Sequence, residues 1–518
     1  MELINNPLVL GPVFIPLFAA VICLLLSRNN RLQRYVAFWA YFVGWLCSIV
    51  VLLMNLAPPP LALTFGGDPA SQLTITWQVG VQTYTVGGWF APFGVMLVAD
   101  MLSAVFGLMA TTVVMIGVLY AVGCKDKAIT YPAFMPLLLT MGGGLVGCFY
   151  TGDIFTLFVF LELMVISSVI LVAISDNRLG LEAAIKYLLI SAMGTLFLLL
   201  GIAEIYASFG TLNLADVANR LQTEGRPLLA QISAVALMAA FLLKSAVFPF
   251  HFWQPDFHTT APTPVGALLS SVVVKVGVYG LIRLTTLLFI DEAPLIQQVL
   301  IVLGVIGIFF GSLGALQTYN AKRLLAYSTF GQIGFILVAI GWGSPIALAA
   351  AIIYAFNQAF IKAALLMITG LVSSRLESKS GRLSEIVGAG QQMTFISSLY
   401  LIGGLALAGV PPLNGFISKV SLVNGGVDVE NWLILGLVVG AGLLTMLYMI
   451  RTWQLIFQRT PEAEHQFKPY GDSPLAPTVL IGICVILGLY AVPLIDLANT
   501  TVAQIGDPHI YIRTVLGG

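Results

Sequence analysis

Five lysines lie inside long apolar stretches of this chain, where a charged side chain is costly. They are Lys186, Lys244, Lys275, Lys362 and Lys419. A lysine at the centre of a bilayer costs about 2.5–3.5 kcal/mol on insertion scales, so five of them without a role would be hard to tolerate. Burial favours the neutral amine, and a group that exists both charged and neutral can pass protons through an apolar interior. Arginine stays protonated, and we expect none in mid-span.

Acidic residues are equally rare in these stretches. Glu162 is the matching acid inside an apolar run. Asp100, Glu182 and Glu204 are weaker candidates for acids that take part in proton transfer. Glu182 stands four residues before Lys186, a spacing that also suits a simple local pair on one helix.

Two histidines flank Asp256 beyond Lys244. His251 lies seven residues after Lys244, so a continuing helix would place both on one face. Histidine titrates near neutral pH, so His251 and His258 could pass protons on; hydrogen-bonded structural histidines are an equally good interpretation. Two histidines and one acid are too few for a zinc site, and the five cysteines form no C-x-x-C pair. We expect no metal and no cofactor, since the chain has no flavin, nucleotide or iron–sulfur motif.

Membrane-spanning helices must position these residues, because the composition excludes a water-soluble protein. Of 518 residues, 59% are hydrophobic and 9% charged, and the mean hydropathy is +0.98, whereas soluble domains have about 25% charged residues. A spanning helix needs about 20 apolar residues. The fourteen predicted spans are 8–27, 33–56, 89–120, 131–149, 153–175, 181–209, 229–249, 261–289, 295–318, 324–343, 347–373, 391–421, 431–457 and 474–497.

Basic residues in the loops orient these spans. With the N-terminus outside, 14 basic residues fall in inner loops and 4 in outer ones. The outer ones are Arg220, Arg226, Arg283 and Arg513. This asymmetry follows the positive-inside rule and places both termini outside. We predict an outer loop or hairpin at 57–88 and an amphipathic connector at 211–226, and no removable signal peptide, because the first run lacks a basic region before it.

Two stretches resemble each other and predict an internal repeat. Leu171–Ser175 reads LVAIS and Leu337–Gly341 reads LVAIG, and Lys186 or Lys362 follows one span later. Chance similarity between apolar strings is the alternative. Two units of five spans each would have opposite orientations, as in many transporters.

Four segments would then make up the chain. Residues 1–130 hold three helices and the outer loop, 131–289 the first five-helix repeat, 295–457 the inverted second repeat, and 458–518 a C-terminal helix. The predicted fold is an all-α integral membrane protein of about 14 transmembrane helices.

Proline interrupts one helix of each predicted unit beside a lysine. Pro249 follows Lys244, and Pro411 and Pro412 precede Lys419. Proline removes a backbone donor, and the freed carbonyls are tolerated in a bilayer only against protein or water. We expect two broken helices that give both lysines a hydrated niche; a simple packing kink is the alternative.

Three stretches resemble a known family. Phe250–Val265 reads FHFWQPDFHTTAPTPV, Lys275–Arg283 reads KVGVYGLIR and Gly409–Lys419 reads GVPPLNGFISK. They resemble the signature of the antiporter-like subunits shared by respiratory complex I, membrane-bound hydrogenases and Mrp-type antiporters. The similarity runs from about Asp100 to Lys419, and the last stretch looks most like the D-type member of the Mrp antiporters.

The resemblance implies a proton path along the middle of the membrane. Glu162 matches the acid of the fifth span and Lys244 its partner on the broken seventh. The further relay positions that the family implies are Lys275, Lys419, Lys186 and Lys362. Relatives often have histidine where this chain has Gln358, and glutamine does not titrate near neutral pH. Either water carries the proton past this position, or protons take another route.

The Glu162 and Lys244 pair would act as an electrostatic switch. A carboxylate near an ammonium group is stabilised ionised, and it becomes ready to accept a proton when the lysine turns away or loses its charge. A static buried salt bridge, which contributes little to stability, is the alternative.

The resemblance further implies a proton-translocating subunit of a multi-subunit Na⁺/H⁺ antiporter in a prokaryotic plasma membrane, a transport subunit with no enzymatic activity of its own. Its partners would be other hydrophobic subunits, protons and Na⁺. The balanced charge, 23 basic against 23 acidic residues, gives no footprint for nucleic acid. A redox-driven pump module of a complex I-like or hydrogenase complex, a stand-alone solute carrier and an inert scaffold are the alternatives.

Overall fold

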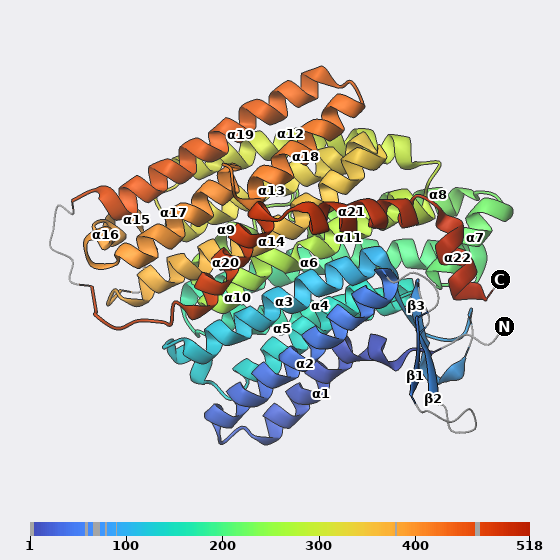
Figure 1. Ribbon diagram of the computed structural model, residues 1–518, viewed down its shortest axis with the longest axis horizontal. Coiled ribbons are helices and arrows are strands. Elements are labelled where there is room, and N and C mark those ends of the chain that lie inside the picture. The colour runs from blue at the N-terminus through green and yellow to red at the C-terminus, as the bar shows by residue number, and fades with distance from the viewer. Residues whose placement is uncertain are drawn as a thin grey trace.

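The computed structural model describes residues 5–56, 61–65, 73–77, 80–89, 91–378, 381–460 and 467–517. It is a bundle of long helices that run roughly side by side, with both chain ends at one end of the bundle (Figure 1). Within these ranges, ten helices are long and apolar enough to cross a membrane, or eleven if one bent pair is counted as a span. The prediction of a mostly helical membrane protein is confirmed.

Nine of these spans each consist mainly of one long helix. They are α1 (Gly11–Leu25), α2 (Asn30–Leu56), α3 (Met101–Gly123), α5 (Ile154–Ala173), α6 (Arg178–Phe209), α12 (Ala293–Gln317), α13 (Ala321–Trp342), α14 (Pro345–Ser374) and α19 (Trp432–Trp453). The span Thr263–Leu288 is composite. It consists of α10 (Thr263–Leu268), a π-helical turn (Leu269–Val273), α11 (Lys275–Arg283) and a second π-helical turn (Leu284–Leu288).

Shorter elements complete the bundle. The shorter helices are α4 (Phe134–Tyr150), α7 (Leu214–Thr223), α8 (Leu228–Lys244), α9 (Gln254–Thr260), α15 (Leu383–Ile386), α16 (Ala389–Gln392), α17 (Thr394–Ala408), α18 (Asn414–Asp428), α20 (Leu475–Leu489), α21 (Val492–Ile505) and α22 (Pro508–Leu516). The end of the bundle away from the chain termini carries most of the loop lysines and arginines; we call it the basic end.

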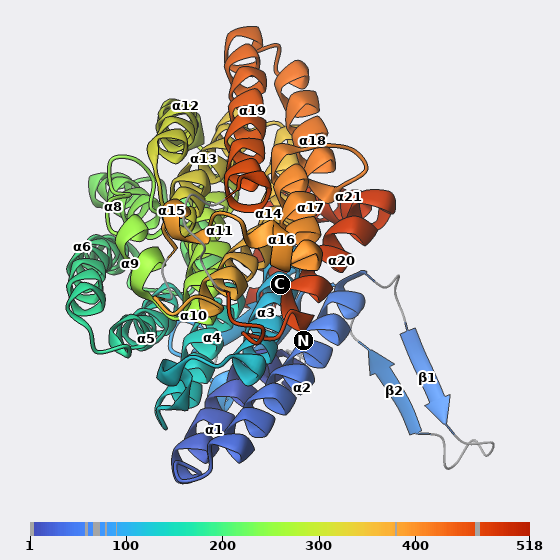
Figure 2. The same cartoon turned by 90° about the vertical axis from the view of Figure 1, so that its left-hand side faces the viewer.

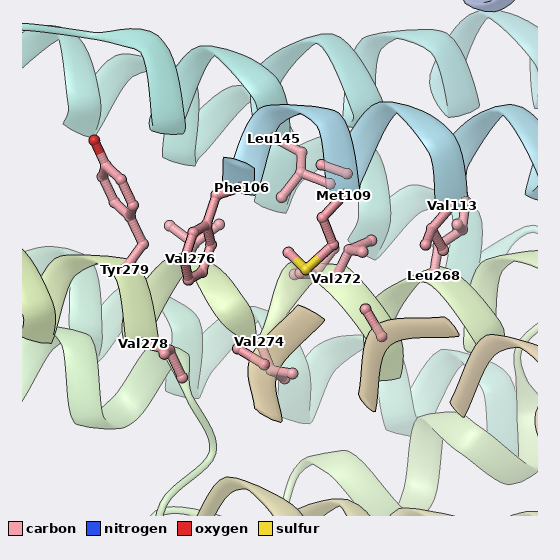
Figure 3. Close-up of a cluster of buried hydrophobic side chains, with 14 of the residues drawn as sticks. Phe106, Met109, Val113, Leu145, Leu268, Val272, Val274, Val276, Val278 and Tyr279 are labelled. Carbon is pink, nitrogen blue, oxygen red and sulfur yellow. The ribbon is translucent and has the colours of Figure 1, made fainter. Parts of the chain in front are cut away.

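Four spans form the interior. Over their most apolar windows α14 and Thr263–Leu288 are 100% buried, α13 is 94% buried and α3 is 78% buried, against 33–50% for the peripheral spans α1, α2, α5, α6, α12 and α19. Met109 and Val113 of α3 lie against Val272 and Leu268 (Figure 3). Polar side chains on these inner spans are therefore shielded from lipid by protein.

Two spans are broken beside a lysine. Helix α8 ends at Lys244 itself, and a non-helical stretch leads to α9. Helix α17 ends at Ala408, five non-helical residues follow, and α18 begins at Asn414. Because a helix end leaves carbonyl groups without intrahelical partners, each break provides backbone acceptors at the depth of an amine.

The described part of 57–88 contains the hairpin that the sequence prediction allowed there. Strands β1 (Leu61–Phe65) and β2 (Leu73–Trp77) pair antiparallel and project from the bundle (Figure 2), and β3 (Gln82–Thr85) pairs with β4 (Met96–Ala99). Two details of the sequence prediction are wrong. The third span begins at Met101 rather than at 89, since Asp100 caps it by accepting from Ser103 N at 2.9 Å. The C-terminal segment bends by 79° between α20 and α21 and continues into α22.

Candidate functional site

Three of the five lysines singled out in the sequence are buried in the bundle, and a fourth is partly buried. Lys275 and Lys362 have 0% exposed surface and Lys244 has 7%, while Lys419 is partly buried. Each amine is held mainly by uncharged oxygen atoms of hydroxyl, amide or backbone groups. Such partners can hold an ammonium group without fixing its charge.

Lys244 and Glu162 are joined through hydroxyl groups of α6. Lys244 Nζ donates to Ser191 Oγ at 2.9 Å and to Thr195 Oγ1 at 3.2 Å. Thr195 Oγ1 in turn donates to Glu162 Oε1 at 2.5 Å. The direct distance from Lys244 Nζ to Glu162 Oε1 is 4.0 Å, at the outer limit of an ion pair. The acid and the amine are thus close and are bridged by the hydroxyl of Thr195.

Ser191 and Thr195 were not among the residues predicted from the sequence. They are four residues apart on α6, so they share one face. Two hydroxyl residues at this spacing in an apolar helix are the sequence feature that could have identified them.

Lys275 is bonded to Gln358, which lies on the same helix as Lys362. Lys275 Nζ donates to Gln358 Oε1, and Gln358 lies four residues before Lys362 on the same face of α14. Lys362 Nζ donates to Leu325 O at 2.9 Å and to Ser328 Oγ at 2.7 Å, both on α13. The residue that departs from the family pattern therefore lies between two buried lysines.

Lys419 lies in α18, and its side chain reaches back to the end of α17. Its Nζ donates to the free carbonyl of Ala408 at 2.5 Å and lies 5.9 Å from the ring centroid of Phe335, within cation–π range. Asn357, next to Gln358 on α14, donates to Ser418 Oγ at 2.9 Å. Helix α14 is thereby tied to the residue that adjoins Lys419.

Lys186 is separate from this group. Its side chain is 44% exposed and pairs with Glu182 at 2.7 Å and with Asp256 at 2.9 Å. The local pair with Glu182 is present, but the structure does not bring Lys186 to the buried lysines. Glu204 is partly buried, and one of its carboxylate oxygens has no hydrogen-bond partner within the described residues.

The two histidines lie in different surroundings. His258 is 2% exposed, and neither ring nitrogen has a partner within the described chain; Lys362 and Lys322 are the charged groups that act on it. His251 packs its ring against Phe310 and Phe330, with centroid distances of 4.4 and 5.1 Å. The expectation that His251 shares a helix face with Lys244 is wrong, because α8 ends at Lys244.

A buried ion pair joins α3 to α11. Arg283, expected in an outer loop, is only 6% exposed and forms two bonds to Asp100, at 2.5 and 2.7 Å. Its guanidinium group lies 5.1 Å from the ring centroid of Tyr279 and 5.2 Å from that of Tyr511. Arg283 lies near the end of the span Thr263–Leu288 and not at its middle, and a bidentate carboxylate satisfies its charge.

Replacing Asp100 by Asn should lower the stability of the folded protein, because the buried guanidinium loses its counter-ion. Removing one partner of a buried pair costs about 3–5 kcal/mol. We expect a lower Tm in thermal unfolding of the detergent-purified protein, and recovery when Arg283→Met is added. A single variant as stable as the wild type would contradict this structural role.

Within the described residues, no group of three or more His, Cys, Asp or Glu could hold a metal ion. The site is thus a row of titratable side chains, with hydroxyl and amide groups between them.

Comparisons with known proteins agree with this architecture. The sequence profile of the family described as NADH:quinone oxidoreductase/Mrp antiporter, TM, matches residues 151–445. The D-type subunit of the Na(+)/H(+) antiporter of Alkalihalophilus pseudofirmus is 30% identical, with 99% of both chains covered. The N-type subunit of the NADH-quinone oxidoreductase of Desulforudis audaxviator is 33% identical, with 92% of this chain and 95% of the relative covered.

A solved structure shares the fold. A chain of the Mrp complex from Dietzia sp. DQ12-45-1b superposes with a TM-score of 0.86 over 99% of both chains, at 24% identity. The profile match covers more than half of the sequence, and it includes Glu162 and every buried lysine of the row. This chain therefore belongs to the NADH:quinone oxidoreductase/Mrp antiporter transmembrane family.

Proposed function

We propose that this chain is the proton-translocating subunit of a multi-subunit Na⁺/H⁺ antiporter in a prokaryotic plasma membrane. The proton path consists of Glu162, Lys244, Lys275, Lys362 and Lys419. One observation carries the proposal: three of these lysines are buried and the fourth, Lys419, is partly buried, and all four amines are held mainly by neutral oxygens. The relative from Alkalihalophilus pseudofirmus, a Na(+)/H(+) antiporter subunit that matches over 99% of both chains, supports the choice of Na⁺ and H⁺.

The groups that contact the lysine amines are mostly uncharged, so the amines can gain and lose protons. Lys275, Lys362 and Lys419 form no ion pair within the described part of the chain, so no carboxylate there holds them permanently charged. Lys244 differs because it has an acid nearby, and Thr195 separates the two. A proton on Lys244 stabilises ionised Glu162, and its departure makes Glu162 the next acceptor.

His258, Lys186 and His251 are proposed to serve exchange with the basic end. His258 is a buried imidazole with both nitrogens free of partners within the described residues. Lys186 is partly exposed and ion-paired, which suits a position at the surface better than one in the row. His251 is partly buried and stacked among aromatic rings, so it serves in second place after His258.

Gln358 is proposed to couple Lys275 to Lys362. Gln358→Leu should slow proton movement by about 10–100-fold, because the Lys275 amine loses its acceptor. Gln358→His should retain the flux, since imidazole can accept the same bond and titrates near neutral pH. The measurement is Na⁺-driven pH change in everted vesicles. A Leu variant as fast as the wild type would remove Gln358 from the path.

We further infer fourteen spans in two inverted repeats, 131–289 and 295–457, with 1–130 before them and 458–518 after. Ten long helices, the bent pair and three shorter apolar helices support this number. In each unit the fourth span is the broken one, α8–α9 or α17–α18. An even number of spans places both termini on one side, and the positive-inside rule makes that side extracytoplasmic.

A redox-driven pump module is the second candidate function. The 33% identity with a subunit of an NADH-quinone oxidoreductase favours it. Copurification from the native membrane separates the two proposals: other hydrophobic antiporter subunits and Na⁺-driven proton movement support the first. Redox subunits, with proton movement driven by electron transfer and not by Na⁺, would overturn it.

A further inference from the structure

A polar cavity of about 800 Å³ opens at the basic end of the bundle. We call it the vestibule. Its wall includes Lys125 to Ala128 after α3, the first residues of α6, Thr259 to Ala261 at the end of α9, Lys322 of α13 and the end of α14. The proton path proposed for the row of lysines uses none of these residues.

Four basic residues from three separate connections line the vestibule. They are Lys125, Lys127, Arg178 and Lys322. Lys127 and Arg178 are exposed, and neither forms an ion pair within the described part of the chain. The positive-inside rule accounts for basic residues in these loops, but it does not require them to converge on one cavity.

The two acids of the vestibule are engaged by protein groups. Asp472 accepts from Tyr120 OH and from Lys125 N, each at 2.8 Å. Asp126 accepts from Ala128 N at 3.4 Å. Four basic side chains against two acids leave the lining with an excess of positive charge.

Two apolar side chains lie in the same wall. Tyr131 is 49% exposed and Leu179, next to Arg178, is 66% exposed. Tyrosine is enriched where the bilayer meets water, so a tyrosine and a leucine beside basic residues suit the level of the lipid headgroups. The lining combines charge for a head group with apolar surface for an acyl chain.

We propose that the vestibule binds a phosphate-bearing anion, with Lys127 and Arg178 as its principal contacts. A guanidinium fork matches two phosphate oxygens, and basic pockets between membrane helices on the cytoplasmic side bind anionic headgroups. An anionic phospholipid and free phosphate share this chemistry; Tyr131 and Leu179 favour the phospholipid. The bound anion would link the connection after α3, which carries Lys127, to the start of α6, which carries Arg178.

The test uses the purified complex that contains the full chain. Thermal unfolding is followed with short-chain phosphatidylglycerol, with phosphatidylcholine of equal chain length, and with inorganic phosphate against chloride at equal ionic strength. The variant is Lys127→Gln with Arg178→Gln. The matched control is Arg28→Gln with Arg31→Gln, which removes two exposed charges outside the vestibule.

We expect phosphatidylglycerol to raise the Tm of the wild type and of the control more than phosphatidylcholine does. The vestibule variant should need about 30-fold more phosphatidylglycerol for the same shift, because two basic contacts are lost. Inorganic phosphate that reproduces the shift alone would assign the site to free phosphate.

Equal responses of the vestibule variant and the control would overturn the proposal. Native mass spectrometry gives a second reading, since the vestibule variant should retain fewer phosphatidylglycerol molecules than the control. Neither thermal unfolding nor native mass spectrometry requires ion transport, so the outcome of both measurements is independent of the proposed function.

Discussion

Lys275→Ala should reduce Na⁺-driven proton movement by at least about 100-fold, the effect expected when a group that transfers protons is removed. Lys275 has 0% exposed surface and begins α11, and its amine donates to Gln358 on α14. It thus makes a polar contact between the composite span and α14. Alanine removes the amine without adding volume, so the helices should still assemble.

The measurement is the Na⁺-induced change in internal pH of everted vesicles, normalised to the amount of assembled complex. Lys468→Ala is the matched control, because this lysine is 52% exposed and pairs with Glu377 at the surface. We expect the control to transport at the wild-type rate. Unchanged flux in Lys275→Ala, with normal assembly, would exclude Lys275 from the path.

Glu162→Gln should reduce Na⁺-driven proton movement to a comparable extent. The substitution keeps the shape of the side chain but removes the carboxyl group that alternates between its ionised and protonated forms. The hydrogen bond from Thr195 would persist with the amide oxygen as acceptor, so local packing should be preserved. The amide neither binds nor releases a proton near neutral pH. We expect flux to fall by about 100-fold or more at every pH, since no titration can restore the acid.

Two further variants sharpen this test. Glu224→Gln removes an acid that is 54% exposed and should leave flux unchanged. Thr195→Val removes the hydroxyl bridge but keeps both charged partners, so we expect a partial loss of flux. If Glu162→Gln transports like the wild type, the pair with Lys244 is a static salt bridge, and the switch is wrong.

The membrane class and the location of the breaks were predictable from the sequence. The free energy of transferring a residue into lipid depends mainly on residue type, so apolar runs mark spans and lysines within them stand out. Proline disrupts a helix wherever it lies, and α8 and α17 do end close to Pro249 and Pro411. These properties are local, so no knowledge of the packing was needed.

The direction in which each side chain points was not predictable in this way. Helices α5 and α6 are apolar on nearly all sides, and such helices have no face that the sequence marks as buried. Lys186 and Lys362 read alike, yet one is 44% exposed in an ion pair at the surface and the other has 0% exposed surface. The packing of the surrounding helices determined which of the two lysines is buried.

Contacts between distant parts of the chain were also beyond the sequence. Arg283 and Asp100 are 183 residues apart, and Lys275 and Gln358 are 83 apart. Each residue taken alone is a costly polar group in an apolar helix. The residue types thus showed which side chains need a polar partner inside the membrane. Which partner each of them finds depended on how the helices pack, because a hydrogen bond or ion pair forms only at contact distance.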